Sequence, residues 1–388
     1  MKLSCKTSDL LQALHLTGKA IGVQQALPIL GNVLLEVEGK RCRVSATDLE
    51  ISITTSFEAS IENEGSITVP AKAILNFAQY NNDPEVLLET SEGTQLKCHS
   101  KHSKAVIAGE AATEYPTITP VQKKITFSLD ADTLLQALHL VTFACAKTSL
   151  RPVLSGVYLK SEKGKLTLVA TDSYRLSEYV IPIPSSQEEF SCIMPSKVLD
   201  ELKMILASRR TGRAAENRAK DAQDGKPEEK MGIDVTLSAQ QVEFRLGNTQ
   251  IISRLIDGKF PDYQQIIPKN IATTILFPIP DLTTAVKRMH YFAKEMNNNL
   301  TFRCAPGETT ITTPVTQMGR DEAIVPGECN GSEVKIALSS SYLLDFLGHV
   351  PADSVEMCVS DGLHPAIFRL PQAAPFLHLI MPLRLQEE

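Results

Sequence analysis

The chain lacks the sequence features of a membrane protein and of a secreted protein. No apolar run in its 388 residues approaches the roughly 20 residues that a membrane-spanning helix needs. The N-terminal segment also lacks the long apolar core of a signal peptide. Apolar residues at 43% and charged residues at 22% are typical of an ordinary globular protein. We therefore expect a soluble, cytoplasmic protein with no membrane partner.

The sequence also lacks cysteine and histidine residues at the spacings of metal ligands. The eight cysteines lie far apart in the sequence, with no Cys-x-x-Cys pair and no histidine at ligand spacing. Several of them, such as Cys42, fall in strand-like apolar patterns. Reduced thiols in the core of a cytoplasmic protein are the expected state. The sequence therefore predicts no structural zinc site, no other metal site and no cofactor.

Motifs of the common enzyme classes are absent as well. The chain has no phosphate-binding loop, no dinucleotide-binding glycine motif, no G-x-S-x-G elbow and no H-E-x-x-H pair. Asp48 and Asp172 each follow a threonine and could be read as catalytic carboxylates. An aspartate at a strand end more often accepts hydrogen bonds from the backbone N–H groups of a turn. We expect no catalytic residue and no intrinsic catalysis.

The chain does contain a long internal repeat. The heptapeptide Leu-Leu-Gln-Ala-Leu-His-Leu occupies residues 10–16 and again residues 134–140, which is 124 positions later. Ala46-Thr47-Asp48 recurs as Ala170-Thr171-Asp172 at the same offset. A constant offset across separate segments indicates that a whole domain has been duplicated, because solenoid repeats have periods of only about 20–50 residues.

The last third of the chain carries a fainter third copy. Residues 338–345 resemble residues 194–200, and Ser360-Asp361-Gly362 stands where a Thr-Asp turn is expected. We predict three domains, at residues 1–122, 123–271 and 272–388. The middle copy needs about 24 extra residues, and residues 208–231 supply them. This stretch has almost no bulky apolar residue, so we expect a flexible loop, with a regulated binding tail as the alternative.

Each copy shows the pattern of an α+β domain. In the first copy, apolar spacing predicts a helix over residues 8–22. Alternating patterns predict strands at residues 33–37, 41–46 and 51–54, and Pro70 opens a second helix that ends near Tyr80. Two helices packed on one face of an antiparallel sheet are therefore expected in each of three tandem copies.

These segments together resemble a known family. LPILGNVLLEVEG, RPVLSGVYL, VATDSYRL, SRLIDGKFPDYQQIIPKN, SSYLLDFL and the terminal LIMPLRL closely resemble the bacterial DNA sliding clamp, the beta subunit of DNA polymerase III. The resemblance runs from the first helix to Leu385. It implies a ring-forming, head-to-tail homodimer of six similar domains, with helices lining a central hole and sheets forming the outer wall. Head-to-tail contacts form a ring only if the rotation between subunits closes.

The resemblance implies a processivity factor rather than an enzyme. Such an accessory subunit of the DNA-directed DNA polymerase III encircles double-stranded DNA and tethers the polymerase catalytic subunit. Its other partners are a clamp-loader ATPase, further polymerases and repair proteins. A net charge of −6 argues against a simple basic DNA-binding surface. Encirclement fits this charge because topology, rather than tight contact, holds the duplex.

Residues expected to face the DNA lie on or beside the helices. Gln24 and Thr148 match loop positions where the family touches DNA, although neither residue is basic. The remaining candidates are basic side chains, for which an ordinary solvated helix face is the alternative: Lys19, Lys72, Lys147, Lys197, Lys203, Lys287 and Arg288.

The resemblance also implies an apolar groove that binds short linear peptides of partner proteins between the second and third domains. Leu, Ile, Met and Pro side chains suit an apolar peptide anchor. The sequence departs from the family at Ser173-Tyr174 and at residues 362–365, which predicts an altered peptide preference. The expected lining residues are Arg151, Leu154, Thr171, Ser173, Tyr174, Arg175, Leu176, Pro261, Ile266, Tyr342, Leu363, Pro365, Leu379, Ile380, Met381, Pro382, Leu383, Arg384 and Leu385.

Two alternatives belong to other functional classes. The first is a metal-dependent nucleic-acid-processing enzyme with Asp48, Asp172 and Asp361 as metal ligands. Three carboxylates at equivalent positions of tandem domains are expected to lie far apart, which disfavours a shared ion. The second alternative is a monomeric scaffold built from the same repeats. For the terminal LIMPLRL segment, a simple buried final strand is the alternative to a groove wall.

Overall fold

The computed structural model describes residues 1–22, 27–91, 94–148, 150–184, 188–220, 231–371 and 375–385, with only the backbone described over 211–220. The chain divides into two compact units. Unit 1 comprises Met1–Asp132 and Glu201–Leu255, and unit 2 comprises Thr133–Asp200 and Ile256–Glu388. Among the described residues, no helix combines the length and the apolar character that a membrane span requires.

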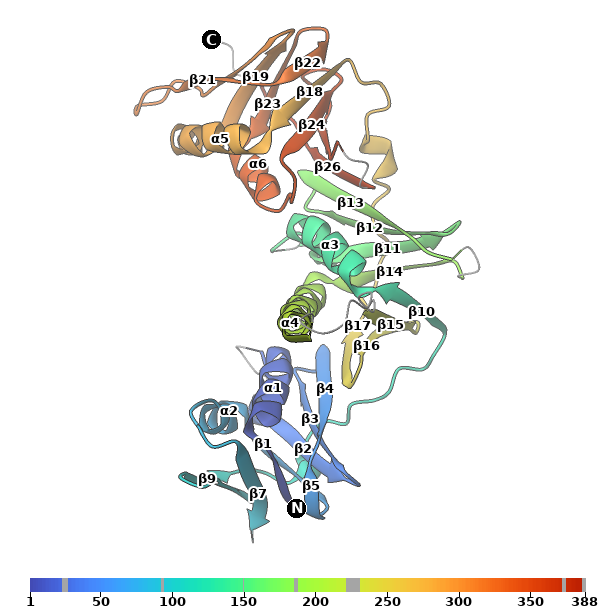
Figure 1. Cartoon of the computed structure of the whole chain (residues 1–388). Helices are drawn as coiled ribbons and strands as arrows, with labels where there is room; N and C mark the ends of the chain where they lie inside the picture. Colours follow the sequence, from blue (N-terminus) through green and yellow to red (C-terminus); the bar gives the residue numbers. More distant parts are fainter. Residues whose placement is uncertain are drawn as a thin grey trace. The chain divides into compact units, whose positions relative to one another are not determined.

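The same order of elements occurs three times along the chain (Figure 1). In the first copy the elements are β1 (Lys2–Lys6), α1 (Thr7–Thr17), β2 (Asn32–Glu38), β3 (Arg41–Thr47), β4 (Ile51–Glu58), β5 (Ser60–Asn63), β6 (Gly65–Pro70), α2 (Ala71–Gln79), β7 (Glu85–Ser91), β8 (Gln95–His99) and β9 (Lys104–Ala108). In the second they are β10 (Ile125–Asp130), α3 (Ala131–Val141), β11 (Gly156–Glu162), β12 (Lys165–Thr171), β13 (Arg175–Pro182), β14 (Phe190–Pro195), α4 (Ser196–Lys220), β15 (Gly232–Leu237), β16 (Gln241–Leu246) and β17 (Thr249–Arg254).

The third copy completes the pattern. Its elements are β18 (Thr273–Pro278), α5 (Ile279–Ala293), β19 (Asn299–Ala305), β20 (Glu308–Thr312), β21 (Glu322–Val325), β22 (Glu328–Gly331), β23 (Val334–Ser339), α6 (Ser340–Leu347), β24 (Ser354–Val359), β25 (Ala366–Arg369) and β26 (Phe376–Ile380). The predicted threefold repeat of an α+β domain with two helices is therefore confirmed. The strands predicted at residues 33–37, 41–46 and 51–54 correspond to β2, β3 and β4.

Within each copy the strands form two half-sheets, and all their pairings are antiparallel. Half-sheet X contains the three strands after the first helix and the strand before the second helix, in the order β6-β2-β3-β4 in the first copy. Half-sheet Y contains the strand before the first helix and the three after the second, in the order β1-β7-β8-β9, and the short strand β5 extends it beyond β1 as β22 does beyond β18 in the third copy. The second copy repeats these orders as β14-β11-β12-β13 and β10-β15-β16-β17.

Half-sheets of successive copies join edge to edge. In unit 1, β4 of the first copy pairs with β17 of the second, which makes an eight-stranded sheet. In unit 2, β13 of the second copy pairs with β26 of the third, which makes a nine-stranded sheet. Half-sheet X of one copy thus joins half-sheet Y of the next copy. Among the described strands, β9 in the first copy and β21 in the third are the two edges of this junction type that have no partner from a neighbouring copy.

Helices pack on the sheets through their apolar faces. Leu10, Ala13 and Leu14 of α1 are buried, and α1 lies beside α2 in the first copy as α5 lies beside α6 in the third (Figure 1). The first helix is shorter than predicted, because α1 ends at Thr17 and a 3₁₀ turn follows over Gly18–Ala20. All eight cysteines are free thiols, and six of them are buried.

The prediction for the middle insert was wrong over its first part. We expected a loop over residues 208–231, but α4 continues from Ser196 to Lys220. Residues 221–230 lie outside the described residues. The misjudged part, residues 208–220, contains four arginines and three alanines, which are good helix formers. Low hydrophobicity alone was therefore a poor guide to the absence of regular structure here.

Candidate functional site

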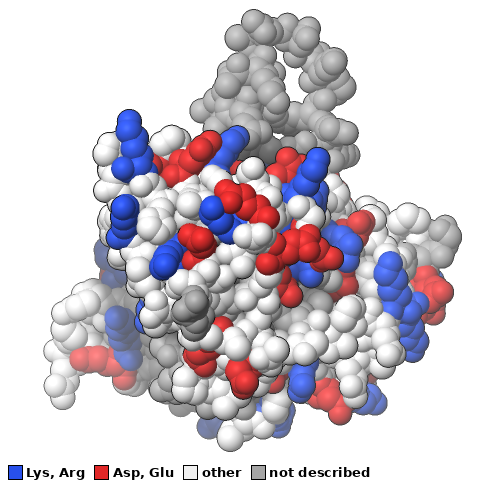
Figure 2. Space-filling model, turned by 90° about the horizontal axis from the view of Figure 1, so that it is seen from below, with Lys and Arg blue, Asp and Glu red and all other residues white. Residues whose placement is uncertain are grey.

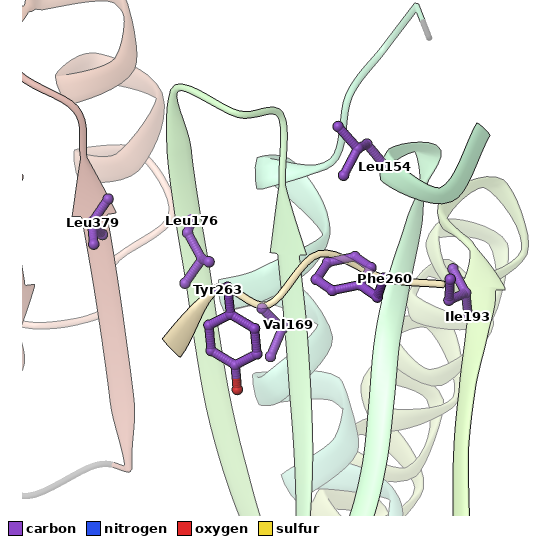
Figure 3. Close-up of a cluster of buried hydrophobic side chains, with 7 residues drawn as sticks. All are labelled: Leu154, Val169, Leu176, Ile193, Phe260, Tyr263 and Leu379. Carbon is purple, nitrogen blue, oxygen red and sulfur yellow. The ribbon is translucent and has the colours of Figure 1, made fainter. Parts of the chain in front are cut away.

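A buried apolar cluster in unit 2 lies where the second and third copies join. Its seven members come from the turn at Pro152–Ser155, from β12, β13, β14 and β26, and from the segment that connects β17 to β18. Figure 3 shows that connecting segment crossing the strands with Phe260 and Tyr263 pointing toward the sheet. The members are Leu154, Val169, Leu176, Ile193, Phe260, Tyr263 and Leu379.

Two aromatic side chains attach the connecting segment to the sheet. The ring of Phe260 stacks on that of Tyr158, with centroids 4.9 Å apart and planes 8° apart. The Tyr263 hydroxyl donates to Glu178 Oε2 at 2.5 Å. Burial, reinforced by this glutamate, raises the pKa of Tyr263, so the hydroxyl keeps its proton. Gly258 permits the approach, because a Cβ at its φ of +132° would lie 2.6 Å from Val153 Cγ1.

A tight turn between β12 and β13 forms one rim of the cluster. Asp172 Oδ1 accepts hydrogen bonds from the backbone N–H groups of Tyr174 and Arg175 at 2.9 and 3.0 Å. The Thr171 hydroxyl donates to Arg175 O at 2.6 Å, and Ser173 has a left-handed φ of 80°. The preceding copy repeats this turn, with Asp48 Oδ1 accepting from residues 50 and 51.

The three aspartates of the alternative enzyme interpretation all hold turns. In the third copy, Asp361 Oδ1 accepts from the backbone N–H groups of Leu363 and His364. Asp48 belongs to unit 1, whereas Asp172 and Asp361 belong to unit 2. Within the described part of the chain, no group of three or more His, Cys, Asp or Glu side chains could hold a metal ion. The prediction that such aspartates satisfy turn N–H groups is confirmed.

Arg175 links the second copy to the third beneath the turn. Its side chain is 4% exposed and donates to Asp172 Oδ2 at 3.0 Å, to Asp345 Oδ2 at 2.5 Å and to the Phe143 carbonyl at 2.8 Å. The guanidinium carbon also lies 5.0 Å from the ring centroid of Tyr342. Arg175, which was predicted to line a groove, is therefore buried and has its charge paired with two carboxylates, of which Asp345 is 35% exposed.

Unit 2 also has large aromatic and aliphatic side chains exposed at its surface. Tyr174 is 62% exposed and stacks on Tyr342 with ring centroids 6.3 Å apart. Leu363 is 85% exposed and Ile266 is 41% exposed. Exposed apolar side chains of this size are typical of a protein-binding site where they form a contiguous patch.

The C-terminal segment continues past its strand. β26 ends at Ile380, and Met381 N then donates to Tyr174 O at 2.8 Å. Leu383 N donates to Ala337 O at 2.8 Å, and Arg384 O accepts from Asn299. The interpretation of LIMPLRL as only a buried strand was therefore incomplete, because residues 381–385 are partly or fully exposed.

The predicted groove residues separate into a buried floor, a half-buried part and an exposed part. The buried residues are Leu154, Thr171, Arg175, Leu176, Pro365, Leu379 and Ile380. The half-buried residues are Tyr342, Met381, Pro382 and Leu383, and the exposed ones are Arg151, Ser173, Tyr174, Pro261, Ile266, Leu363, Arg384 and Leu385. Sequence reasoning missed Val169, Ile193, Phe260 and Tyr263. Phe260 and Tyr263 flank Pro261 in the FPDY motif, so this motif carried a usable signal.

The residues predicted to face DNA differ in their exposure and in whether their charge is already paired. Lys72, Lys147, Thr148, Lys197 and Lys287 are exposed, and Lys203 is half-buried, whereas Gln24 lies outside the described residues. Lys19 forms an ion pair with Glu201 at 3.3 Å. Arg288 donates two hydrogen bonds to the Asp321 carboxylate at 2.8 and 2.9 Å, which neutralises its charge. On the face seen in Figure 2, basic and acidic side chains are interspersed.

Family models match most of the chain. The N-terminal domain of the DNA polymerase III beta subunit matches residues 1–119, its central domain residues 128–212 and its C-terminal domain residues 264–384. The chain is 28% identical to the beta sliding clamp of Synechocystis sp. and 27% identical to that of Haemophilus influenzae. Both alignments cover 99% of this chain and 100% of the relative.

Solved structures agree with these sequence matches. The DNA polymerase III subunit beta of Pseudomonas aeruginosa superposes with a TM-score of 0.90 at 25% identity, over 99% of this chain and 100% of the other. The sliding clamp of the same organism bound to griselimycin gives a TM-score of 0.89 at 25% identity, with the same coverage. The beta subunit of Thermotoga maritima gives 0.88 at 25% identity, again with this coverage.

Proposed function

The chain belongs to the DNA polymerase III beta subunit family, the bacterial sliding clamps, and on that premise we propose that it is a ring-shaped processivity factor for DNA replication. Two chains encircle duplex DNA and tether the DNA polymerase III catalytic subunit to its template. The chain is an accessory subunit of this DNA-directed polymerase and carries out no reaction of its own. We assign its three clamp domains to residues 1–122, 123–271 and 272–388.

The pairing of half-sheets between successive copies is the observation that supports a ring. Half-sheet X of each copy joins half-sheet Y of the next copy, through β4–β17 and β13–β26. Half-sheet X of the third copy and half-sheet Y of the first remain, with edges at β21 and β9. Pairing β21 of one chain with β9 of another applies the same rule once more. The resulting contact is head-to-tail, and two such contacts close a homodimer of six domains.

The side chains of the two edge strands suit this contact. Val106 in β9 is 60% exposed, and Ile324 in β21 is 66% exposed. Unpaired, exposed apolar edge strands are a liability in a monomer, because they offer hydrogen-bonding groups to any passing strand. Burying these strands against each other removes that liability. The monomeric scaffold is the weaker interpretation for this reason.

Duplex DNA is held by enclosure rather than by tight binding. A net charge of −6 and interspersed surface charges are poor for a surface that must displace phosphate counterions. Exposed lysines such as Lys72, Lys147 and Lys287 provide weak, salt-sensitive contacts that allow sliding. A closed ring cannot thread onto circular DNA unaided, so a clamp-loader ATPase is an expected partner. The site of action is the cytoplasm.

The apolar cluster and its exposed rim form the partner groove. Linear peptides of the polymerase, the loader and repair proteins insert apolar anchors beside Leu154, Leu176 and Leu379, against the connecting segment of Phe260 and Tyr263. Tyr174 and Leu363 lie exposed at the rim, where they gain contact area with a bound peptide. Met381 adapts the floor to different anchors.

The solution mass tests the assembly directly. Sedimentation equilibrium of the intact chain at micromolar concentration is expected to give twice the 42.5 kDa of one chain. A single-chain mass across that range would contradict the proposed ring. A mass that increases without limit as concentration rises would indicate open head-to-tail filaments and would also contradict it.

A further inference from the structure

A stack of four side chains runs from the buried junction of the second and third copies to the surface of unit 2. The Arg175 guanidinium carbon lies over two rings, 5.4 Å from the centroid of Phe143 and 5.0 Å from that of Tyr342. The Tyr342 ring in turn stacks on Tyr174, with centroids 6.3 Å apart and planes 19° apart. We call these four residues the aromatic stack.

Hydrogen bonds hold both ends of the aromatic stack in place. At the inner end, the buried Arg175 side chain donates to the carboxylates of Asp172 and Asp345. At the outer end, Tyr174 N donates to Asp172 Oδ1 at 2.9 Å, and Tyr174 O accepts from Met381 N at 2.8 Å. The Tyr174 side chain therefore extends from a backbone that is bonded on both sides.

Tyr174 has one ring face open to solvent. The residue is 62% exposed, although Tyr342 already covers one side of its ring. Among the described residues, Tyr342 provides the only ring on which Tyr174 stacks. An exposed area of this size on a ring that is covered from one side requires that the other face lie in solvent. The aromatic stack thus ends in a free aromatic surface.

A free aromatic face of this kind attracts a planar cation. A guanidinium group binds the face of a tyrosine ring by electrostatic attraction and by stacking, and arginine does so more often than lysine. The inner end of the aromatic stack already shows this chemistry, because the Arg175 guanidinium lies over Tyr342. A second guanidinium on the outer face of Tyr174 would repeat the contact.

The charges at the base of the aromatic stack also favour a cation. Asp172 and Asp345 contribute two carboxylates against the single guanidinium of Arg175, and the Asp345 side chain is 35% exposed. His349 Nδ1 bonds to the Asp345 carbonyl oxygen at 2.7 Å and lies 3.7 Å from its carboxylate. The three ionised side chains therefore leave one formal negative charge beneath the tyrosines.

We propose that partner peptides of the unit 2 groove carry an arginine next to an apolar anchor, and that its guanidinium stacks on the open face of Tyr174. This inference rests on the proposed partner groove and names the chemistry of its ligand. Leu176, two positions after Tyr174, is buried in the apolar cluster and faces Leu379 of β26. Neighbouring residues of an extended peptide, at about 3.3 Å per residue, can therefore reach the cluster and the tyrosine together.

Three matched peptides test the proposal. The first is a fluorescent peptide of sequence Ser-Leu-Arg-Leu-Arg-Leu-Ser, and the others replace both arginines with lysine or with glutamine. Leucine anchors are common to all three, and lysine keeps the charge without the planar group. Anisotropy with the intact chain in 0.15 M salt at pH 8 is expected to give about tenfold tighter binding of the arginine peptide than of the glutamine peptide. Its advantage over the lysine peptide should be about threefold.

Two variants locate the arginine. Tyr174→Leu removes the ring and keeps an apolar side chain, so the difference between the arginine and lysine peptides should disappear. The affinity for the glutamine peptide should change by less than about twofold, and an unchanged melting temperature shows that the variant folds. Tyr291→Leu removes a tyrosine of similar exposure, 60%, from α5 and is the matched control that should keep the full ranking.

Two results would overturn the arginine preference. Equal affinities of the intact chain for the arginine and lysine peptides would show that charge alone is recognised. An arginine preference that survives in Tyr174→Leu would place the guanidinium elsewhere. Neither result bears on the groove itself, because the leucine anchors still bind. Failure of all three peptides to bind would instead overturn the partner groove, and this inference with it.

Discussion

Arg175 and Asp345 form an ion pair between Nη1 and Oδ2 at 2.5 Å, although 170 residues separate them in the sequence. Arg175 begins β13 of the second copy, and Asp345 lies in α6 of the third. The pair therefore connects a strand of one copy to a helix of the next, directly below the exposed Tyr174.

Removing this arginine should strongly destabilise unit 2. Arg175→Met leaves Asp172 Oδ2, Asp345 and the Phe143 carbonyl without their buried donor. Loss of one partner from a fully buried ion pair costs about 3–5 kcal/mol, and a smaller loss of about 2–3 kcal/mol is expected here because the Asp345 side chain is 35% exposed. Urea unfolding monitored by circular dichroism measures this loss. Arg384→Met, at an exposed position of the same predicted groove, is the control and should change the free energy by less than about 0.5 kcal/mol. Equal effects of the two substitutions would contradict this role for Arg175.

Charges placed on the edge strands should open the ring. Val106→Asp in β9 or Ile324→Asp in β21 buries an unpaired carboxylate in the proposed subunit contact. Either substitution should raise the dimer dissociation constant at least a hundredfold, as measured by sedimentation velocity over a concentration series.

The matched control for the edge strands is Val315→Asp. Val315 is 74% exposed and lies outside the strands, between β20 and β21. This variant should remain dimeric. The β9–β21 contact would be refuted if all three variants kept the dissociation constant of the unmodified chain.

The turn between β3 and β4 stores backbone strain at Leu49. This residue has a φ of 76°, in the left-handed region that glycine tolerates best. Leu49→Gly relieves about 1–2 kcal/mol of strain in the folded chain. The greater entropy of the unfolded chain with glycine costs roughly 0.4–1 kcal/mol of stability, so the free energy of unfolding is expected to rise by about 0.5–1 kcal/mol. Glu50→Gly, next in the same turn, has no strain to relieve and should lose stability. Thermal unfolding of both variants measures the contrast, and a loss in both would contradict the strain.

Acidification should weaken the junction through His378. This fully buried histidine shares a hydrogen bond with Ser177 Oγ at 2.8 Å and stacks on Phe346 with centroids 4.5 Å apart. Burial, aided by the nearby Arg175 and His349, lowers its pKa well below the usual 6.5. The unfolded chain therefore binds a proton below pH 6.5 that the folded chain does not bind. The histidine's contribution is complete above that pH and is lost as the pH falls.

Linkage gives the size of this effect. One such histidine lowers the free energy of unfolding by about 1.4 kcal/mol between pH 7.5 and pH 5.5. Guanidinium unfolding at the two pH values is the measurement, and His378→Phe should remove about that much of the difference. His15→Gln, at an exposed position of α1, should leave it unchanged. An identical pH dependence in His378→Phe would show that this histidine is protonated in the folded chain too.

Much of the fold follows from local sequence. The heptapeptide at residues 10–16 and 134–140 becomes α1 and α3, and the Thr-Asp pairs become turns whose aspartates accept backbone hydrogen bonds. Helices and turns form through contacts between residues that are close in the sequence, so the local residue pattern is enough to predict them. The course of α4 beyond residue 208 was mispredicted because a polar helix and a loop share much of their composition.

The pairing between copies could not be predicted from the residues. Ile53 faces Ile251, and Leu176 faces Leu379, but alternating apolar patterns are compatible with many strand partners. Arg175 illustrates the same gap in the candidate site. Its position in a motif predicted a groove residue, but its ion pair with Asp345, which is far away in the sequence, could not be predicted. Phe260 and Tyr263 entered the cluster because of a segment that crosses the sheet, and no local pattern encodes that crossing.

Retention on DNA of different topology tests the central proposal most directly. The chain is loaded onto nicked circular duplex by its clamp-loader ATPase with ATP, and free protein is removed by gel filtration in high salt. We predict that the ring stays on the circle and is lost within minutes once a restriction enzyme cuts the circle open. Equal retention on circular and linear DNA would contradict encirclement.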